Sequence, residues 1–187
     1  MSDFDTGPEL HEGGDDHGYD GGEHSYDDGG HAILAEYTDG SQTLVVDENH
    51  DGYADLVAND QDGDGNPETV YTNEFGHDNQ LDTVQVDAND DGQFDAFASD
   101  RNADGEFDLA GFDRNHDGDI DLLVADQDYD GKIDTAVADE NYDGRPDLIV
   151  EDPDEDGHAT ITTDQNFDGT FDTVHYDDPD TNPFVKH

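Results

Sequence analysis

The sequence predicts an all-β protein in which acidic loops alternate with short strands in a tandem array. Three observations support this prediction: a loop pattern recurs every thirteen residues or so, β-favouring residues follow each loop, and only 30% of residues are apolar. We expect the repeats to stack into an elongated β-roll or solenoid. An antiparallel β-meander is the alternative, and periodicity does not decide between the two because apolar residues occupy both parities of the short strands.

The repeated loop has the pattern Asp-x-[Asp/Asn]-x-Asp-Gly-x-x-[Asp/Glu]. Eight complete copies begin at residues 47, 60, 87, 100, 113, 126, 139 and 164, and two degenerate copies begin at 74 and 152. Successive copies start 12 to 14 residues apart, so the array runs without a break over residues 47–176. Self-similarity at a short fixed period is the signature of a repeat architecture.

Each repeat divides into a loop and a strand. Glycine occupies the sixth loop position, where the backbone has to turn sharply. The residues that follow read DLLVA, DTAVA or DLIV, which are segments rich in β-favouring side chains. Because only four or five such residues precede the next loop, the segment is too short for a helix, and we predict a strand.

The ends of the chain differ from the array. Residues 32–46 hold two apolar runs without the loop aspartates, and we expect them to form an N-terminal β cap. Residues 1–31 are rich in Asp, Gly and His and low in apolar residues, which predicts a disordered tail. Residues 177–187 are expected to form a C-terminal cap or tail.

Four histidines recur in the predicted tail, at His11, His17, His24 and His31. Imidazole suits Zn²⁺, Ni²⁺ and Cu²⁺, so one interpretation is a loose site for such an ion. The simpler interpretation is a solvated tail with incidental histidines, and we favour it.

The charge of the chain excludes several kinds of partner. The formal net charge is −49 and there are only five Lys and Arg residues, so no basic surface for nucleic acid or anionic lipid is expected. No apolar run approaches 18 residues, so we expect no membrane span. The acidic N-terminus predicts no classical signal peptide. A compact state of this charge would repel itself, which predicts dependence on cations.

The loop chemistry predicts calcium. Calcium takes six to eight oxygen ligands, and in a curling loop positions 1, 3 and 5 point side chains at one centre. Position 7 would add a backbone carbonyl, and the acid at position 9 would close the site in place of the Glu at position 12 of an EF-hand. We therefore predict about eight Ca²⁺ sites, or ten if the degenerate loops also bind. The predicted ligands are Asp47, Asn49, Asp51, Asp55, Asp60, Asp62, Asp64, Glu68, Asp87, Asn89, Asp91, Asp95, Asp100, Asn102, Asp104, Asp108, Asp113, Asn115, Asp117, Asp121, Asp126, Asp128, Asp130, Asp134, Asp139, Asn141, Asp143, Asp147, Asp164, Asn166, Asp168 and Asp172.

Segments such as DENYDGRPDLIV (139–150) and DRNHDGDIDLLV (113–124) resemble the calcium loops of FG-GAP/VCBS-type repeats of integrin-like propellers. The spacing is also similar to that of thrombospondin type 3 repeats. The resemblance covers residues 47–176 at the level of the loop, and it implies calcium held between two strands of a hairpin. A propeller blade needs several times thirteen residues, so the resemblance carries the loop chemistry and not the propeller fold.

No catalytic set is visible, so we expect no enzymatic activity: Cys is absent and no Ser lies in a Gly-x-Ser-x-Gly setting. The leading hypothesis is a structural or interaction protein that folds on calcium binding, outside the cell or at its surface, and is exported without a leader. The sequence does not name its protein or surface partner. The alternative is a cytoplasmic high-capacity calcium buffer. Affinity separates the two, because extracellular sites have Kd values on the order of 10⁻⁴–10⁻³ M whereas buffers bind far more tightly.

Overall fold

The computed structural model describes residues 24–26, 31–75, 79–154 and 157–176, which form thirteen strands and no helix. The strands are β1 (His24–Tyr26), β2 (Ala32–Glu36), β3 (Gln42–Val46), β4 (Leu56–Asp60), β5 (Thr69–Thr72), β6 (Thr83–Val86), β7 (Ala96–Ser99), β8 (Leu109–Phe112), β9 (Leu122–Ala125), β10 (Thr135–Ala138), β11 (Leu148–Glu151), β12 (Thr160–Thr163) and β13 (Thr173–Tyr176). Accordingly, the described part of the chain offers no apolar helix of membrane-spanning length.

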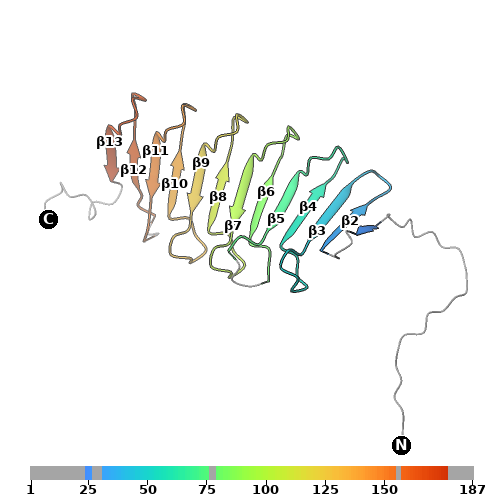
Figure 1. Cartoon of the computed structure of the whole chain (residues 1–187). Coiled ribbons are helices and arrows are strands. Elements are labelled where there is room, and N and C mark those ends of the chain that lie inside the picture. Colours follow the sequence, from blue (N-terminus) through green and yellow to red (C-terminus); the bar gives the residue numbers. More distant parts are fainter. Residues whose placement is uncertain (1–23, 27–30, 76–78, 155–156, 177–187) are drawn as a thin grey trace, which may run out of the picture.

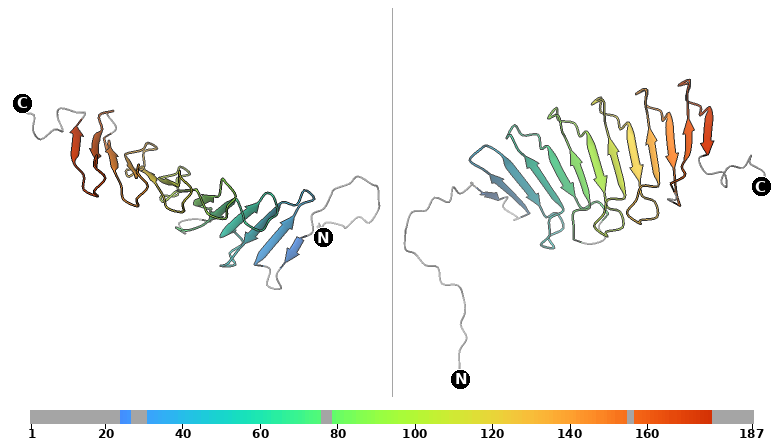
Figure 2. Two further views of the ribbon diagram at one scale, coloured as in Figure 1. Left: turned by 90° about the horizontal axis from the view of Figure 1, so that it is seen from above. Right: turned by 180° about the vertical axis from the view of Figure 1, so that it is seen from behind.

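All thirteen strands belong to one open sheet, in which each strand pairs antiparallel with the next one along the chain (Figure 1). The sheet twists along its length (Figure 2). The predicted all-β class is confirmed. The favoured β-roll is not confirmed, because the chain path is that of the antiparallel meander.

The loop itself explains why the chain turns back. In each complete loop but one, the N–H of position 9 donates to the carbonyl of the residue just before position 1, as from Asp121 to Phe112 at 2.9 Å. This bond closes a hairpin, so the two ends of the loop lie side by side on neighbouring strands. A roll would need the loop to carry the chain onward to another layer.

The predicted chain divisions agree with the strands only in part. The predicted cap at 32–46 contains β2 and β3, which form a hairpin around residues 37–41. Strand β1 lies inside the range 1–31 that we expected to be disordered, and it pairs with β2. Residues 1–23, 27–30 and 177–187 lie outside the described residues.

The meander also explains why apolar residues occupy both parities of the strands. Val137 is the third residue of β10, and its cross-strand partners Leu123 and Ile149 are the second residues of β9 and β11. Because neighbouring strands run in opposite directions, odd-numbered positions of one four-residue strand lie on the same face of the sheet as even-numbered positions of the next strand. Both faces of this sheet therefore carry apolar rows.

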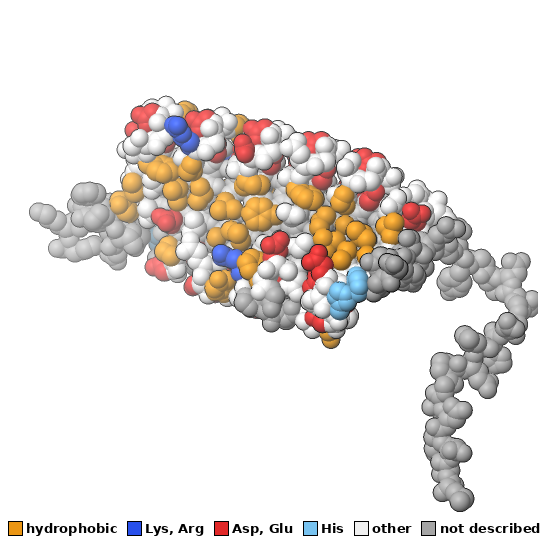
Figure 3. Space-filling model, in the orientation of Figure 1, with side chains coloured by type: hydrophobic (Ala, Val, Ile, Leu, Met, Phe, Trp, Pro, Cys, Tyr) orange, Lys and Arg blue, Asp and Glu red, His pale blue; other side chains and the backbone are white. Residues whose placement is uncertain are grey.

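A single layer leaves this sheet without an apolar core. Ala138 is the only buried apolar residue among those described, and most strand residues are half-buried. Figure 3 shows a hydrophobic band across the sheet, with acidic side chains along its edges. Apolar burial therefore gives this fold less stabilisation than it gives a two-layer domain of similar size.

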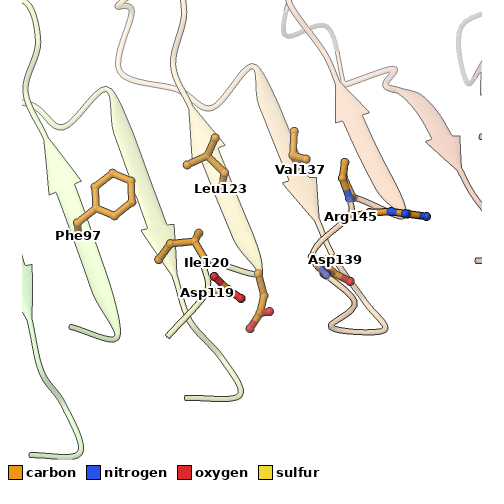
Figure 4. A pocket seen from close by; sticks show the side chains of 10 residues that line it. Phe97, Asp119, Ile120, Leu123, Val137, Asp139 and Arg145 are labelled. Carbon is orange, nitrogen blue, oxygen red and sulfur yellow. The ribbon is translucent and has the colours of Figure 1, made fainter. Parts of the chain in front are cut away.

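A shallow hollow of about 560 Å³ lies on one face of the sheet over β7 to β10 and the loop that follows β10. Phe97, Ile120, Leu123 and Val137 line its apolar part (Figure 4). Gly111 pairs with both Phe97 and Leu123, and the Phe97 ring covers the space where a Gly111 side chain would stand. The missing side chain thus lets the aromatic ring lie flat across the neighbouring strand.

Gly63 departs from the repeat pattern for a steric reason, which a substitution can test. It occupies position 4 of its loop with φ at +78°, and an added Cβ would collide with the backbone carbonyl of Gly40 in the adjacent turn. We expect Gly63→Ala to lower the free energy of unfolding by about 1–3 kcal/mol more than Gly52→Ala. Gly52 also has a positive φ but faces open space, so its substitution adds only backbone strain. Equal losses in denaturant unfolding would contradict the steric explanation.

Candidate metal centres

Aspartates at the two ends of the loops are among the most buried side chains in the described part of the protein. The buried carboxylates lie at position 1 or position 9 of their loops: Asp60, Asp82, Asp87, Asp95, Asp100, Asp108, Asp113, Asp121, Asp126, Asp134, Asp139, Asp147 and Asp164. Of the ion pairs between described residues, Arg114–Glu140, Lys132–Asp130 and His116–Asp95, only the last includes a buried aspartate. Burying unpaired carboxylates is costly, so these groups require compensation from another source.

Backbone amides supply part of that compensation at position 1. In the loop at 113, one oxygen of Asp113 accepts the N–H of His116 at 2.7 Å, and the other accepts the N–H of Gly118 at 2.8 Å. The same two bonds recur in the seven other complete loops. Each loop therefore curls around its first aspartate.

The remaining predicted ligands are held by the same device. The side-chain oxygen of Asn115 at position 3 accepts the N–H of Asp117, whose own Oδ1 at position 5 accepts the N–H of position 7. At position 9, Oδ2 of Asp121 accepts the N–H groups of positions 2 and 3, the closer being Arg114 at 2.8 Å. Positions 1, 3, 5 and 9 are thus fixed by the backbone of one nine-residue loop.

These amides lower the pKa of the first aspartate. Burial raises the pKa of the Asp113 carboxyl, but the N–H groups of Gly118, His116 and nearby residues outweigh it, so the pKa lies below its ordinary value. The same balance of causes lowers the pKa of Asp139 and Asp164. These position 1 groups therefore stay ionised at neutral pH, as ligands of a hard cation must be.

Two loops bring three carboxylates within ligand distance of one another. The oxygens of Asp126, Asp128 and Asp134 lie within 4.8 Å of one another, and a second such group comprises positions 1, 3 and 9 of the loop at 60. These are the two complete loops with Asp at position 3; the other six have Asn there, so an amide oxygen takes the third place. The structure therefore groups the predicted ligands most closely where all of them are acids.

Several buried oxygens at ligand positions accept no hydrogen bond from the described residues. They are Oδ1 of Asp134 at position 9, Oδ1 of Asn141 at position 3, and Oδ1 of Asp152 at position 1 of a degenerate loop. Asp134 is only 3% exposed. A buried carboxylate oxygen without a donor is strongly destabilising unless a cation lies beside it, so the donor set fits an oxygen-ligated metal.

All 32 predicted ligands lie in described loops. Successive loops lie alternately at the two long sides of the sheet, where the strands end, and we call these sides its edges (Figure 1). Loops 26 residues apart are neighbours on one edge: the N–H of Asp113 donates to the carbonyl of Asp95, and Asp139 bonds Asp121 likewise. Since strands lie about 4.8 Å apart, neighbouring sites on an edge are about 10 Å apart. The last loop is the most open, because Asp172 at position 9 is exposed.

The structure identifies two acidic residues that the ligand prediction omits. Asp82, at position 9 of the degenerate loop at 74, is buried, and it accepts the N–H groups of Glu74 and Phe75, which are positions 1 and 2, whereas position 9 of a complete loop accepts those of positions 2 and 3. Its register in the repeat was a signal for this role. Asp90 reaches from position 4 of its loop to Asp62 and Asp64 of the neighbouring loop, forming a group of three carboxylates.

Repulsion among Asp62, Asp64 and Asp90 raises the pKa of Asp90, chiefly through the negative charge of Asp62. Asp90 reaches its neighbour because position 4 adopts a left-handed conformation in all eight complete loops, with φ near +60° at Asp90 itself. That conformation was not expected for residues such as Ala103 or Phe167, and the sequence carries no clear signal for it.

A histidine at position 4 makes one loop sensitive to pH. His116 Nδ1 lies 2.5 Å from Oδ1 of Asp95 in the neighbouring loop. This hydrogen bond raises the pKa of His116 above 6.5 and lowers the pKa of Asp95 below 3.8. The histidine's contribution to stability is complete below its unfolded pKa and is lost as pH rises through the raised value. The aspartate's contribution is present above its unfolded pKa and is lost as pH falls through the lowered value.

The pair should therefore stabilise the sheet most between about pH 4 and pH 6.5. We expect His116→Asn to lower the free energy of unfolding at pH 5.5 and to have a much smaller effect at pH 8.5. Asn tolerates the left-handed conformation of this position. Denaturant unfolding of both chains at one fixed free calcium concentration provides the measurement, and a pH-independent difference would contradict this assignment.

Fold and site together define an antiparallel repeat sheet whose edges carry acidic groups able to hold metal ions. Comparisons of the chain with protein-family models, with curated proteins and with solved structures gave no match.

Proposed function

We propose that this protein is a multi-site calcium-binding structural or interaction protein that folds when calcium binds. The observation that carries the proposal is the burial of thirteen aspartates, nearly all at predicted ligand positions, in a described sheet with one buried apolar residue. An ion in each complete loop would turn this destabilising set of charges into the main source of stability.

The donor set favours calcium over other common ions. Each complete loop offers carboxylate and amide oxygens at positions 1, 3, 5 and 9, with no His or Cys at these positions. Hard cations prefer such ligands, whereas zinc and copper favour imidazole or thiolate. Magnesium demands a smaller octahedron and keeps several waters, so a loop rich in protein oxygens suits calcium better.

Calcium binding and folding should be one event. Eight divalent ions would neutralise about a third of the formal charge of −49, and without them that charge opposes a compact sheet. The ligands of each site lie in the turn of one hairpin, so the site does not exist before that hairpin forms. Binding free energy at each loop is therefore folding free energy.

We place this function outside the cytosol, where calcium is abundant enough to fill weak sites. Measured affinity provides the test of location: Kd values on the order of 10⁻⁴–10⁻³ M fit an extracellular structure, whereas values below about 10⁻⁷ M fit a cytoplasmic calcium buffer. Isothermal titration calorimetry of the full chain gives both affinity and stoichiometry.

Circular dichroism during a calcium titration tests the proposal. In a chelator we expect the spectrum of an unfolded chain, and added calcium should produce the strand signal with about eight ions bound per chain. Magnesium at the same concentration and ionic strength is the control, and it should produce much less strand. A chain that shows its full strand signal in the chelator would overturn the proposal.

A further inference from the structure

Two histidines meet at the edge of the sheet, outside the calcium ligands. His31 lies just before β2, and His50 is position 4 of the first complete loop, 19 residues later. Their ring centroids are 3.5 Å apart, and their Nε2 atoms are 2.8 Å apart. The backbones are joined too, because the N–H of Asp47 donates to the carbonyl of His31 at 2.8 Å. Both rings are thus positioned by the hairpin ladder.

The protonation of His50 follows from its second ring nitrogen. Nδ1 lies 2.7 Å from the carbonyl oxygen of Glu48, which can only accept, so Nδ1 carries the hydrogen. In the neutral ring Nε2 is then the unprotonated nitrogen, and it lies against Nε2 of His31. A ring whose far N–H bonds a backbone carbonyl while Nε2 presents its lone pair is the arrangement of metal-ligating histidines.

We propose that His31 and His50 form a binding site for a divalent transition metal of the copper or nickel kind, separate from the calcium sites. A metal about 2.0–2.1 Å from each nitrogen would set the nitrogens about 2.9 Å apart at a right angle and about 3.3 Å apart at a tetrahedral angle. The observed 2.8 Å is close to the right-angle value, and the ring centroids, now 3.5 Å apart, would have to separate to about 4.5 Å for both lone pairs to point at one ion. Square-planar and tetragonal sites of this kind suit Cu²⁺ and Ni²⁺.

The site depends on the loop without using its ligands. His50 has φ at +66°, and its N–H donates to Asp47 Oδ1 at 2.7 Å, so the folded loop sets the direction of the ring. Calcium takes oxygen and not imidazole, and the carboxylates of the loop remain available to it. A transition metal should therefore bind in the presence of saturating calcium.

Copper titration of the full-length chain tests this proposal. His11, His17 and His24 are first replaced by Asn, so that upstream imidazoles do not bind the probe. With calcium saturating, we expect one equivalent of Cu²⁺ to bind and its electron paramagnetic resonance spectrum to show two ligating nitrogens. In this background, His31→Asn or His50→Asn should weaken copper binding at least tenfold, because losing even an outer partner costs about 10- to 100-fold.

His116→Asn is the matched control. It also replaces a left-handed histidine at position 4, but its ring bonds an aspartate. We expect this variant to bind copper as the background chain does. The proposal is overturned if His31→Asn and His50→Asn also do so, or if excess calcium displaces the copper. The strand signal of each variant shows that it is folded, and a chain that folds without calcium would still test the histidine pair.

Discussion

A tenfold rise in free calcium should raise the free energy of unfolding of this protein by about 11 kcal/mol. Each ion that binds only the folded sheet contributes about 1.4 kcal/mol per tenfold change in concentration above its Kd, and the sheet has eight complete loops. Ten occupied loops would give about 14 kcal/mol. The total stability of a folded protein is typically about 5–15 kcal/mol, so an effect of this size should be unmistakable.

Denaturant unfolding at several buffered calcium concentrations measures this slope. Each strand contacts only its neighbours, so the sheet can unfold in segments, and the slopes of successive transitions are then added. Potassium chloride at matched ionic strength is the control for screening, and its effect should be small and gradual. A total slope below about 1.4 kcal/mol per tenfold change would mean that fewer than one ion stabilises the fold.

Replacing Asp134 by Asn should destabilise the protein by about 3–5 kcal/mol in saturating calcium, because a buried charge loses its partner. Oδ2 of Asp134 accepts the N–H groups of Gln127 and Asp128, and Oδ1 lies buried without a donor. An amide can keep those bonds with its oxygen only by turning its NH₂ group toward the ion. The variant should also bind one calcium fewer.

Asp119→Asn is the matched control, since it removes the same charge from an exposed position that is not a predicted ligand side chain. It should change the stability by about 0.5 kcal/mol or less in calcium. Without calcium, Asp134→Asn should be the less destabilising of the two variants in any part of the sheet that stays folded, because it then removes an uncompensated buried charge. If the two variants behave alike in calcium, the acids act only through general repulsion and not as ligands.

The sequence predicted the loops well because their requirements are local. Glycine at position 6 adopts a positive φ in every complete loop, as at Gly118, and the acids at positions 1 and 9 are the buried ones. A nine-residue loop that makes its own hydrogen bonds needs no information from the rest of the chain. The predicted strands follow for the same reason, since each loop fixes where the next strand begins.

The favoured roll is not confirmed, and the local pattern does not decide between roll and meander because it does not specify strand direction. Loops that turn back and loops that wrap onward have the same residues, and the parity of Leu123 and Val137 makes sense only once the strands are known to alternate. The sequence pattern does not predict contacts between loops for a similar reason. Asp90 meets Asp62, and His31 meets His50, only because the meander places every second loop on the same edge.

The order of the strands also decides how this protein would respond to tension. With β1 and β13 at opposite ends of one sheet, a force on the two ends acts across the strands and peels them away singly. Each step releases about thirteen residues, or roughly 45 Å of extended chain. The meander would thus lengthen in even steps, and if calcium binds as proposed, the force of each step would depend on the ion in the hairpin that opens next. Single-molecule pulling would show evenly spaced force peaks that weaken as calcium is withdrawn.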